Sequence, residues 1–160
     1  MGNVLTDKDR TLLMSHLNNT GVFVTLGQKT PNIMVTHWAM LGKMWGREVF
    51  VLPIRSSKYS YQIITQTKSF ALNVPAHDMR GEISRCDAIS GYNCNKFLEL
   101  GLHPKRAKSI EAYVLGECGL IVECNVIAQI PPDGITTYND TKISSHTLFV
   151  GEIAECYKLN

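Results

Sequence analysis

The sequence predicts a mainly β protein, an antiparallel β-barrel with peripheral helices. Six or seven strand-like segments, rich in β-branched and aromatic residues, are spread over the 160 residues. About three helix-like segments lie among them without alternating strictly with the strands, which argues against a doubly wound parallel sheet. Neither a G-x-G-x-x-G loop nor a Walker lysine loop occurs in the sequence. We expect a single domain over residues 1–160. A nucleotide, if one binds, would be held by a structural element other than these two loops.

The first predicted element is a helix over residues 6–17. Thr6 or Asp7 can cap its start, and acidic residues follow in its first turn. Two strand-like runs come next, GVFVTLG at 21–27 and NIMVTHW at 32–38. The short polar segment between them suits the turn of a hairpin.

In the middle of the chain a strand is expected to lead directly into a helix. The strand EVFVLPIR spans 48–55 and contains Pro53, which suggests an edge position or a bulge because proline cannot donate a ladder hydrogen bond. The helix is expected over residues 59–67, and the strand SFALNVP follows it at 69–75.

The last part of the chain predicts two short helices and two long strands. The helices are expected at 78–90 and 93–100, and the strands at 119–130 and 146–156. Gly151 lies inside the last strand, which suggests a bulge or a close approach of another chain segment.

The composition excludes several classes of protein. A formal net charge of +2 with 19% charged residues gives no basic stripe of the kind that binds nucleic acid. No apolar run is long enough to span a bilayer. The five cysteines lack C-x-x-C spacing, which argues against a disulfide framework or a zinc site. Reduced thiols and the lack of an export signal predict a cytoplasmic protein with neither a nucleic-acid nor a membrane partner.

The transition from the strand at 48–55 to the helix at 59–67 gathers groups that bind anions. These are Arg55, Ser56, Ser57, Lys58, Tyr59 and Ser60. A helix N-terminus offers unpaired backbone N–H groups and a partial positive charge, and an arginine can add bidentate hydrogen bonds. We interpret residues 55–60 as a candidate phosphate cradle. The residues alone equally allow Ser57 to cap the helix and Arg55 to lie on the surface.

The strand at 32–38 has one face that mixes polar and apolar groups. Alternation places on this face Asn32, Met34, Thr36 and Trp38, and on the opposite face Ile33, Val35 and His37. A flat heteroaromatic ring suits the mixed face, and so does solvent.

Three isolated residues are further candidates for a binding or catalytic role. Ser90 begins a turn signal with Gly91, and Lys96 lies just inside a helix, where it suits either the surface or a ligand. His146 begins the last strand and suits either a structural hydrogen bond or catalysis. We find no acyl-transfer triad and no metal site in the sequence.

Taken in order, six segments resemble the flavin reductase-like, FMN-binding split-barrel family, to which flavoredoxin-type proteins belong. The segments are NIMVTHW, VLPIRSSKYSYQII, FALNVP, CDAISGYNCNKFLELGL, ECGLIVECNVI and HTLFVGEI. They run from about residue 20 to residue 156. The resemblance implies an FMN-binding split β-barrel that forms homodimers, with FMN near the subunit interface.

The resemblance also implies a role for individual residues. The FMN phosphate would be held by Arg55, Ser56, Ser57, Tyr59 and Ser60. The isoalloxazine and the ribityl chain would be followed by Asn32, Met34, Val35 and Thr36. The flavin would be bordered by Asn73, Ser90 and Lys96. The one catalytic candidate is His146, as an orienting group near the open face of the flavin, where a nicotinamide could stack.

We therefore expect an NAD(P)H-dependent flavin reductase-like oxidoreductase. It would pass electrons from reduced nicotinamide, or from another donor such as a protein, through bound FMN to an acceptor. Three alternatives stay open: a flavin electron carrier without its own nicotinamide site, an oxidase of the pyridoxamine phosphate type, and a small β-barrel interaction module. The sequence does not specify the donor, the acceptor, or the choice between NADH and NADPH.

Overall fold

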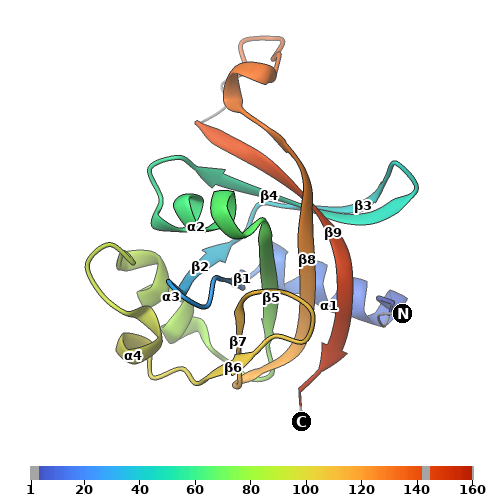
Figure 1. Ribbon diagram of the computed structural model, residues 1–160. Coiled ribbons are helices and arrows are strands. Elements are labelled where there is room, and N and C mark those ends of the chain that lie inside the picture. The colour runs from blue at the N-terminus through green and yellow to red at the C-terminus, as the bar shows by residue number, and fades with distance from the viewer. Residues whose placement is uncertain (1–3, 142–144, 160) are drawn as a thin grey trace.

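Seven strands form one antiparallel sheet that curls into an open barrel (Figure 1). The computed structural model describes residues 4–141 and 145–159. Its elements are α1 (Asp7–Asn18), β1 (Val22–Leu26), β2 (Asn32–Thr36), β3 (Met40–Met44), β4 (Arg47–Arg55), α2 (Tyr59–Thr67), β5 (Ser69–Pro75), α3 (Arg80–Ala88), α4 (Lys96–Leu100), β6 (Pro104–Arg106), β7 (Tyr113–Leu115), β8 (Cys118–Ile130), the 3-10 helix η1 (Pro132–Gly134) and β9 (His146–Lys158). The strand order is β2-β1-β5-β8-β9-β4-β3, and β6 and β7 form a separate pair. Because β2 and β3 end this order without pairing with each other, the described strands form a split barrel, as the sequence predicts.

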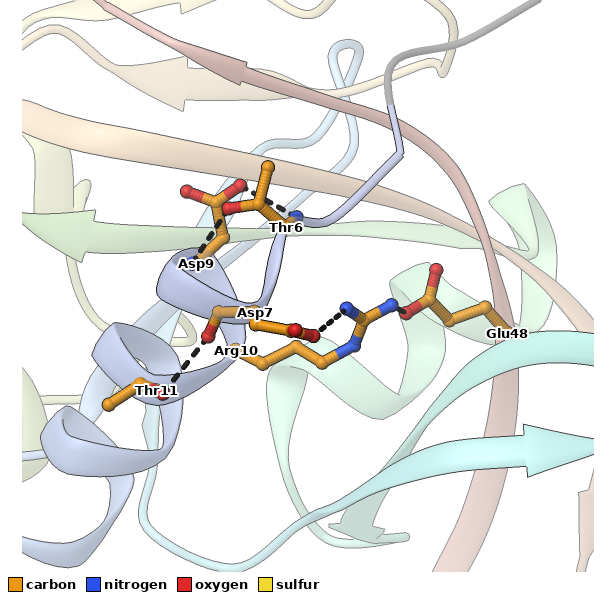
Figure 2. A network of polar contacts seen from close by, with 6 residues as sticks. All are labelled: Thr6, Asp7, Asp9, Arg10, Thr11 and Glu48. Carbon is orange, nitrogen blue, oxygen red and sulfur yellow. Dashed lines mark hydrogen bonds and ion pairs between the residues drawn. The ribbon is translucent and has the colours of Figure 1, made fainter.

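The first helix begins where the sequence predicts, and its start is held by a reciprocal cap (Figure 2). The Thr6 hydroxyl accepts from the Asp9 backbone N–H at 3.1 Å, and the Asp9 carboxylate accepts from the Thr6 N–H at 3.0 Å. Arg10, one residue further on, forms ion pairs with Asp7 of the same helix and with Glu48 of β4. These contacts join α1 to the barrel wall.

Apolar clusters cover both faces of the central part of the sheet. One cluster of apolar side chains includes Leu13 of α1, Ile64 of α2 and Phe149 of β9. The other lies against α3 and α4 and includes Ile83 and Phe97. With both faces covered, all seven residues of β5 are buried. Figure 1 shows α3 and α4 on one side of the molecule and the β3–β4 hairpin projecting from the other.

Gly151 confirms the expectation of a close approach. A Cβ atom at this position would lie 2.7 Å from two ring carbons of Phe70, a distance that side-chain carbons do not tolerate. The facing strand β8 shifts its register between Val126 and Ala128, next to the residue that pairs with Gly151. The bulge therefore lies on β8, and the glycine lies opposite it.

Pro53 lies at an edge, one of the two expectations for it. On one side it pairs with Leu148 of β9, in a register that runs without a shift. On the other side β3 pairs with β4 only from Arg47 to Val51. On the β3 side of β4, therefore, no described strand lies opposite Pro53. A missing backbone N–H is tolerated at such an unpaired edge.

The bounds of α2 and β5 match the predicted 59–67 and 69–75, whereas α3 and α4 are shorter than the predicted 78–90 and 93–100. Three strands were not predicted. The five residues of β3 are mostly exposed and carry no alternating pattern. The short strands β6 and β7 have three residues each, and β6 is exposed throughout. In the described part of the chain, no helix combines the length and the apolar character that crossing a membrane requires.

Candidate functional site

Two adjoining cavities lie where β2, the end of β4, the start of α2 and the loop between α3 and α4 come together. We call them the inner and the outer cavity. The inner cavity has a volume of about 90 Å³ and is lined by Asn32, Met34, Val35, Lys58, Tyr59, Ser60, Cys86, Asp87, Ile89, Ser90, Gly91 and Lys96. The outer cavity has a volume of about 300 Å³ and is lined by Met34, Val35, Thr36, His37, Trp38, Pro53, Ile54, Arg55, Lys58 and His146. Met34, Val35 and Lys58 line both.

The start of α2 is not capped by a side chain. Its N-cap residue is Lys58, whose backbone N–H donates to the Arg55 carbonyl at 3.0 Å, and no side chain accepts from the first turn. Ser57 therefore does not cap this helix, whereas Arg55 is exposed, as the surface interpretation of that residue expects. The Tyr61 N–H donates to the Lys58 carbonyl at 3.0 Å, so the N–H groups of Tyr59 and Ser60 are the ones that an anion could accept from.

The predicted cradle of residues 55–60 divides between the two cavities. Arg55 lines the outer cavity, whereas Tyr59 and Ser60 line the inner one. Ser56 and Ser57 are exposed in the turn and line neither cavity. Lys58, which lines both, belongs to the predicted cradle of residues 55–60 but is not among the residues that the resemblance assigns to the phosphate.

Buried polar groups form the wall of the inner cavity. The Asn32 amide donates to the buried Ser60 hydroxyl at 2.9 Å, so that β2 and α2 are joined behind the cavity. Lys96 is 7% exposed, and its ammonium donates to the Cys86 carbonyl at 2.9 Å. A buried ammonium with a single close carbonyl partner favours an anion nearby, because burial removes the water that otherwise solvates the charge.

Two further side chains set the charge of the inner cavity. Burial raises the pKa of the Cys86 thiol to about 11, although Lys96 opposes this rise, so the thiol is neutral near pH 7. Asp87 is the only carboxylate among the residues that line the two cavities, and it lies 3.9 Å from the His37 ring nitrogen. The balance of charge in the two cavities is cationic, with Arg55, Lys58 and Lys96 opposing one carboxylate.

One tryptophan and two histidines, Trp38, His37 and His146, line the outer cavity. The rings of Trp38 and His146 meet edge to face with their centroids 5.4 Å apart. His146 begins β9 and pairs in register with Arg55 at the end of β4. Burial, followed by the charges of Arg55 and Lys58, lowers the pKa of His146 below its usual 6.5. His146 is therefore mostly neutral near pH 7.

Asn73 does not line either cavity. Its amide nitrogen donates to the Thr25 hydroxyl at 2.9 Å and to the Ala71 carbonyl at 3.2 Å, and its amide oxygen accepts from the Leu115 N–H at 2.8 Å. These bonds join β5 to β1 and β7 inside the core, so the Asn73 side chain has an internal structural role.

The structure thus brings most of the predicted site residues together. Those that line a cavity are Asn32, Met34, Val35, Thr36, Arg55, Tyr59, Ser60, Ser90, Lys96 and His146. Those that do not are Ser56, Ser57 and Asn73. The mixed face of the strand does not line the cavities alone, because Val35 and His37 from the opposite face line them as well.

An open antiparallel barrel is the fold that the resemblance implies, and the comparisons define its class. The model of the flavin reductase like domain matches residues 14–159, so the chain belongs to the flavin reductase-like family. This membership supports a flavin-binding oxidoreductase. An uncharacterized protein of Archaeoglobus fulgidus is 25% identical over 130 residues, which cover 81% of this chain and 67% of that protein.

Solved structures support the same fold. Flavoredoxin of Desulfovibrio vulgaris (Miyazaki F) superposes with a TM-score of 0.71 and 25% identity, covering 86% of this chain and 68% of that one. Flavoredoxin from Methanosarcina acetivorans gives a TM-score of 0.69 at 22% identity, covering 86% and 67%. An NADH:FAD oxidoreductase of Streptomyces globisporus C-1027 gives a TM-score of 0.69 at 16% identity, covering 99% and 88%.

Proposed function

We propose that the protein is an FMN-binding oxidoreductase that passes electrons from reduced nicotinamide, or from another donor, through bound FMN to an acceptor. The observation that carries this proposal is the pair of adjoining cavities of unequal size that share Lys58. Small-molecule sites usually occupy about 300–1,000 Å³. A ring system therefore suits the outer cavity, and the inner cavity suits a compact charged group.

The phosphate end would lie at the start of α2. Arg55 and Lys58 approach this point from the end of β4 and from the turn, and the uncapped first turn of α2 adds backbone N–H donors. Lys96 and Ser90 add an ammonium and a hydroxyl from the inner cavity. These donors suit a phosphomonoester, which carries a charge of about −1.5 to −2 near neutral pH.

The ring would lie along β2 in the outer cavity. Met34 and Val35 offer apolar contacts, and Trp38 bounds the cavity on its exposed side. When bound, the flavin supplies the hydride and electron chemistry, and the protein positions and tunes it. His146, neutral near pH 7 and next to Trp38, would orient the group that approaches the ring. No acid or base from this chain is required for that role.

The proposal also concerns the identity of the electron donor, which is either a reduced nicotinamide or a protein. One relative in the fold is named an NADH:FAD oxidoreductase, which favours a nicotinamide, whereas two others are named flavoredoxins. A flavin carrier that takes electrons from a protein is therefore the second candidate. We further propose a homodimer, because the outer cavity adjoins Trp38, from which an exposed apolar hairpin continues.

Anaerobic titration tests the proposed function. Protein reconstituted with FMN is mixed with NADH or NADPH, and the flavin absorbance is followed. We expect a yellow protein that bleaches with one of the two nicotinamides. Bleaching by dithionite or a reduced ferredoxin but by neither nicotinamide would select the electron carrier. A protein that takes up neither FMN nor FAD would overturn the proposal.

A further inference from the structure

We infer that residues 90–95, here called the strap, are latched to α2 by Tyr92, and that this latch controls how fast FMN leaves the protein. The inference rests on the proposed function and deepens it, because it concerns the retention of the flavin between turnovers. The strap connects α3 to α4, and its first two residues, Ser90 and Gly91, form part of the inner cavity wall.

Two contacts latch the strap to the outer surface of α2. The Tyr92 ring meets the Tyr59 ring edge to face, with centroids 4.9 Å apart. The Gln62 side-chain amide, on the same helix, donates to the Tyr92 hydroxyl at 2.9 Å. Tyr92 is 52% exposed and belongs to neither apolar core cluster, so these contacts explain its place better than core packing does.

The strap lies too close to the barrel for any side chain at position 91. A Cβ atom at Gly91 would lie 2.5 Å from the Asn32 amide oxygen and 2.5 Å from a ring carbon of Tyr59. Asn32 cannot move away easily, because its amide donates to the buried Ser60. The backbone of the strap is therefore pressed against β2 and α2, which closes the inner cavity on this side.

Internal hydrogen bonds make the strap a single unit. The Ser90 carbonyl accepts from the backbone N–H groups of Asn93 at 3.0 Å and Cys94 at 3.2 Å. The Ser90 hydroxyl accepts from the Tyr92 N–H at 3.2 Å. Because the strap is tied together in this way, release of Tyr92 from α2 lets the wall of the inner cavity move away as a whole.

A phosphate in the inner cavity is then held between the strap and α2. Its departure requires the aromatic pair and the Gln62 hydrogen bond to break, which slows dissociation. FMN is consequently a resident group that stays through many turnovers, and the electron acceptor must come to the protein. Riboflavin lacks the phosphate, so the latch has little effect on its dissociation.

Stopped-flow dissociation of FMN and of riboflavin from the reconstituted protein tests the latch. Tyr92→Ala removes both contacts, and we expect FMN to leave about 10-fold faster, equivalent to about 1.4 kcal/mol. Gln62→Ala, at an exposed helix position where folding is not at risk, removes only the hydrogen bond, and about 3-fold is expected. Tyr138→Ala, an exposed tyrosine outside the strap, serves as the matched control and leaves both rates unchanged.

The outcomes separate the latch from the proposed function. Equal FMN dissociation rates in the wild type, Tyr92→Ala and Gln62→Ala would overturn the latch and leave FMN binding intact. Equal acceleration for FMN and riboflavin would also overturn it, since that result reflects general loosening of the site. Failure of the wild type to bind FMN at all would overturn the proposed function and the latch with it.

Discussion

At the scale of single residues, the candidate site contains polar side chains whose hydrogen-bond partners lie on other elements. Lys96 illustrates this. From the sequence it suits either the surface or a ligand, and in the structure it is buried with its ammonium donating to the Cys86 carbonyl. Its neighbour Asn95 caps α4 and fixes where that helix begins. The burial of Lys96 depends on the packing of α4 against α3, which no local sequence pattern indicates.

His16 gives a prediction about stability and pH. Burial lowers its pKa below the usual 6.5, and its Nδ1 atom is buried without a partner among the described residues. The unfolded chain therefore takes up a proton on His16 more readily than the folded protein does. The free energy of unfolding should fall as the pH drops below about 6.5. His146, whose pKa is also lowered, acts in the same direction.

Urea denaturation of the wild type and His16→Gln at pH 7.5 and 5.5 measures this effect. The wild type should lose more stability between the two pH values than His16→Gln does, because the variant lacks the group that resists protonation. An identical loss in both proteins would contradict a depressed pKa for His16.

At the scale of elements, one buried carboxylate joins β8, β9 and the loop between β6 and β7. Glu123 is fully buried and accepts from the backbone N–H groups of Lys108 and Ser109 at 2.6 and 2.7 Å. It also accepts from the Ser109 hydroxyl at 2.5 Å and from the Tyr157 hydroxyl at 2.6 Å. Burial and the bond to Glu123 raise the pKa of Tyr157, so the phenol stays protonated and donates.

We predict that Glu123→Gln lowers the free energy of unfolding by about 2–4 kcal/mol, because a buried, hydrogen-bonded charge is lost and an amide donor is forced against other donors. Tyr157→Phe, which removes one donor, should cost about 1–2 kcal/mol. Glu111→Gln, exposed in the same loop, is the matched control. Chemical denaturation measures all three, and wild-type stability in Glu123→Gln would contradict the role assigned to the carboxylate.

Most elements could be predicted from the sequence, and those that were missed share a physical cause. The helix α2 and the strand β5 have strong local patterns and boundaries, and they form where expected. In contrast, β3 is exposed and has Gly42 at its centre, so its strand state depends on pairing with β4. The site was predicted less completely, since the family resemblance did not assign Lys58 to the phosphate and the Asn73 side chain forms its hydrogen bonds inside the core.

At the scale of the whole molecule, the β3–β4 hairpin carries most of the large exposed apolar side chains of one edge of the sheet. Trp38, Met40, Met44 and Trp45 are each between 49% and 64% exposed. Trp45 has a φ of 53°, in the left-handed region, where asparagine or glycine is usual in a two-residue hairpin turn. A tryptophan at such a backbone position suggests that its exposed ring packs against a binding partner.

We predict that the protein is a homodimer and that Trp45→Asn weakens its association by about 10-fold or more, an effect expected for an interface aromatic. Asparagine suits the turn, so the variant should fold. Sedimentation velocity over a range of protein concentrations measures the association, with Tyr138→Ala as the exposed-aromatic control. A wild type that sediments as a monomer throughout would contradict the prediction.

The central claim is that the FMN phosphate binds at the start of α2, in the inner cavity, with Lys58, which lines both cavities, and Arg55, which lines the outer one, as cationic partners. Calorimetric titration of the wild type and Arg55→Ala with FMN and with riboflavin tests it most directly. We predict that Arg55→Ala weakens FMN binding by about 1.5–3 kcal/mol, typical of a hydrogen bond to a charged group, and leaves riboflavin binding nearly unchanged. Equal weakening of both ligands would contradict the claim.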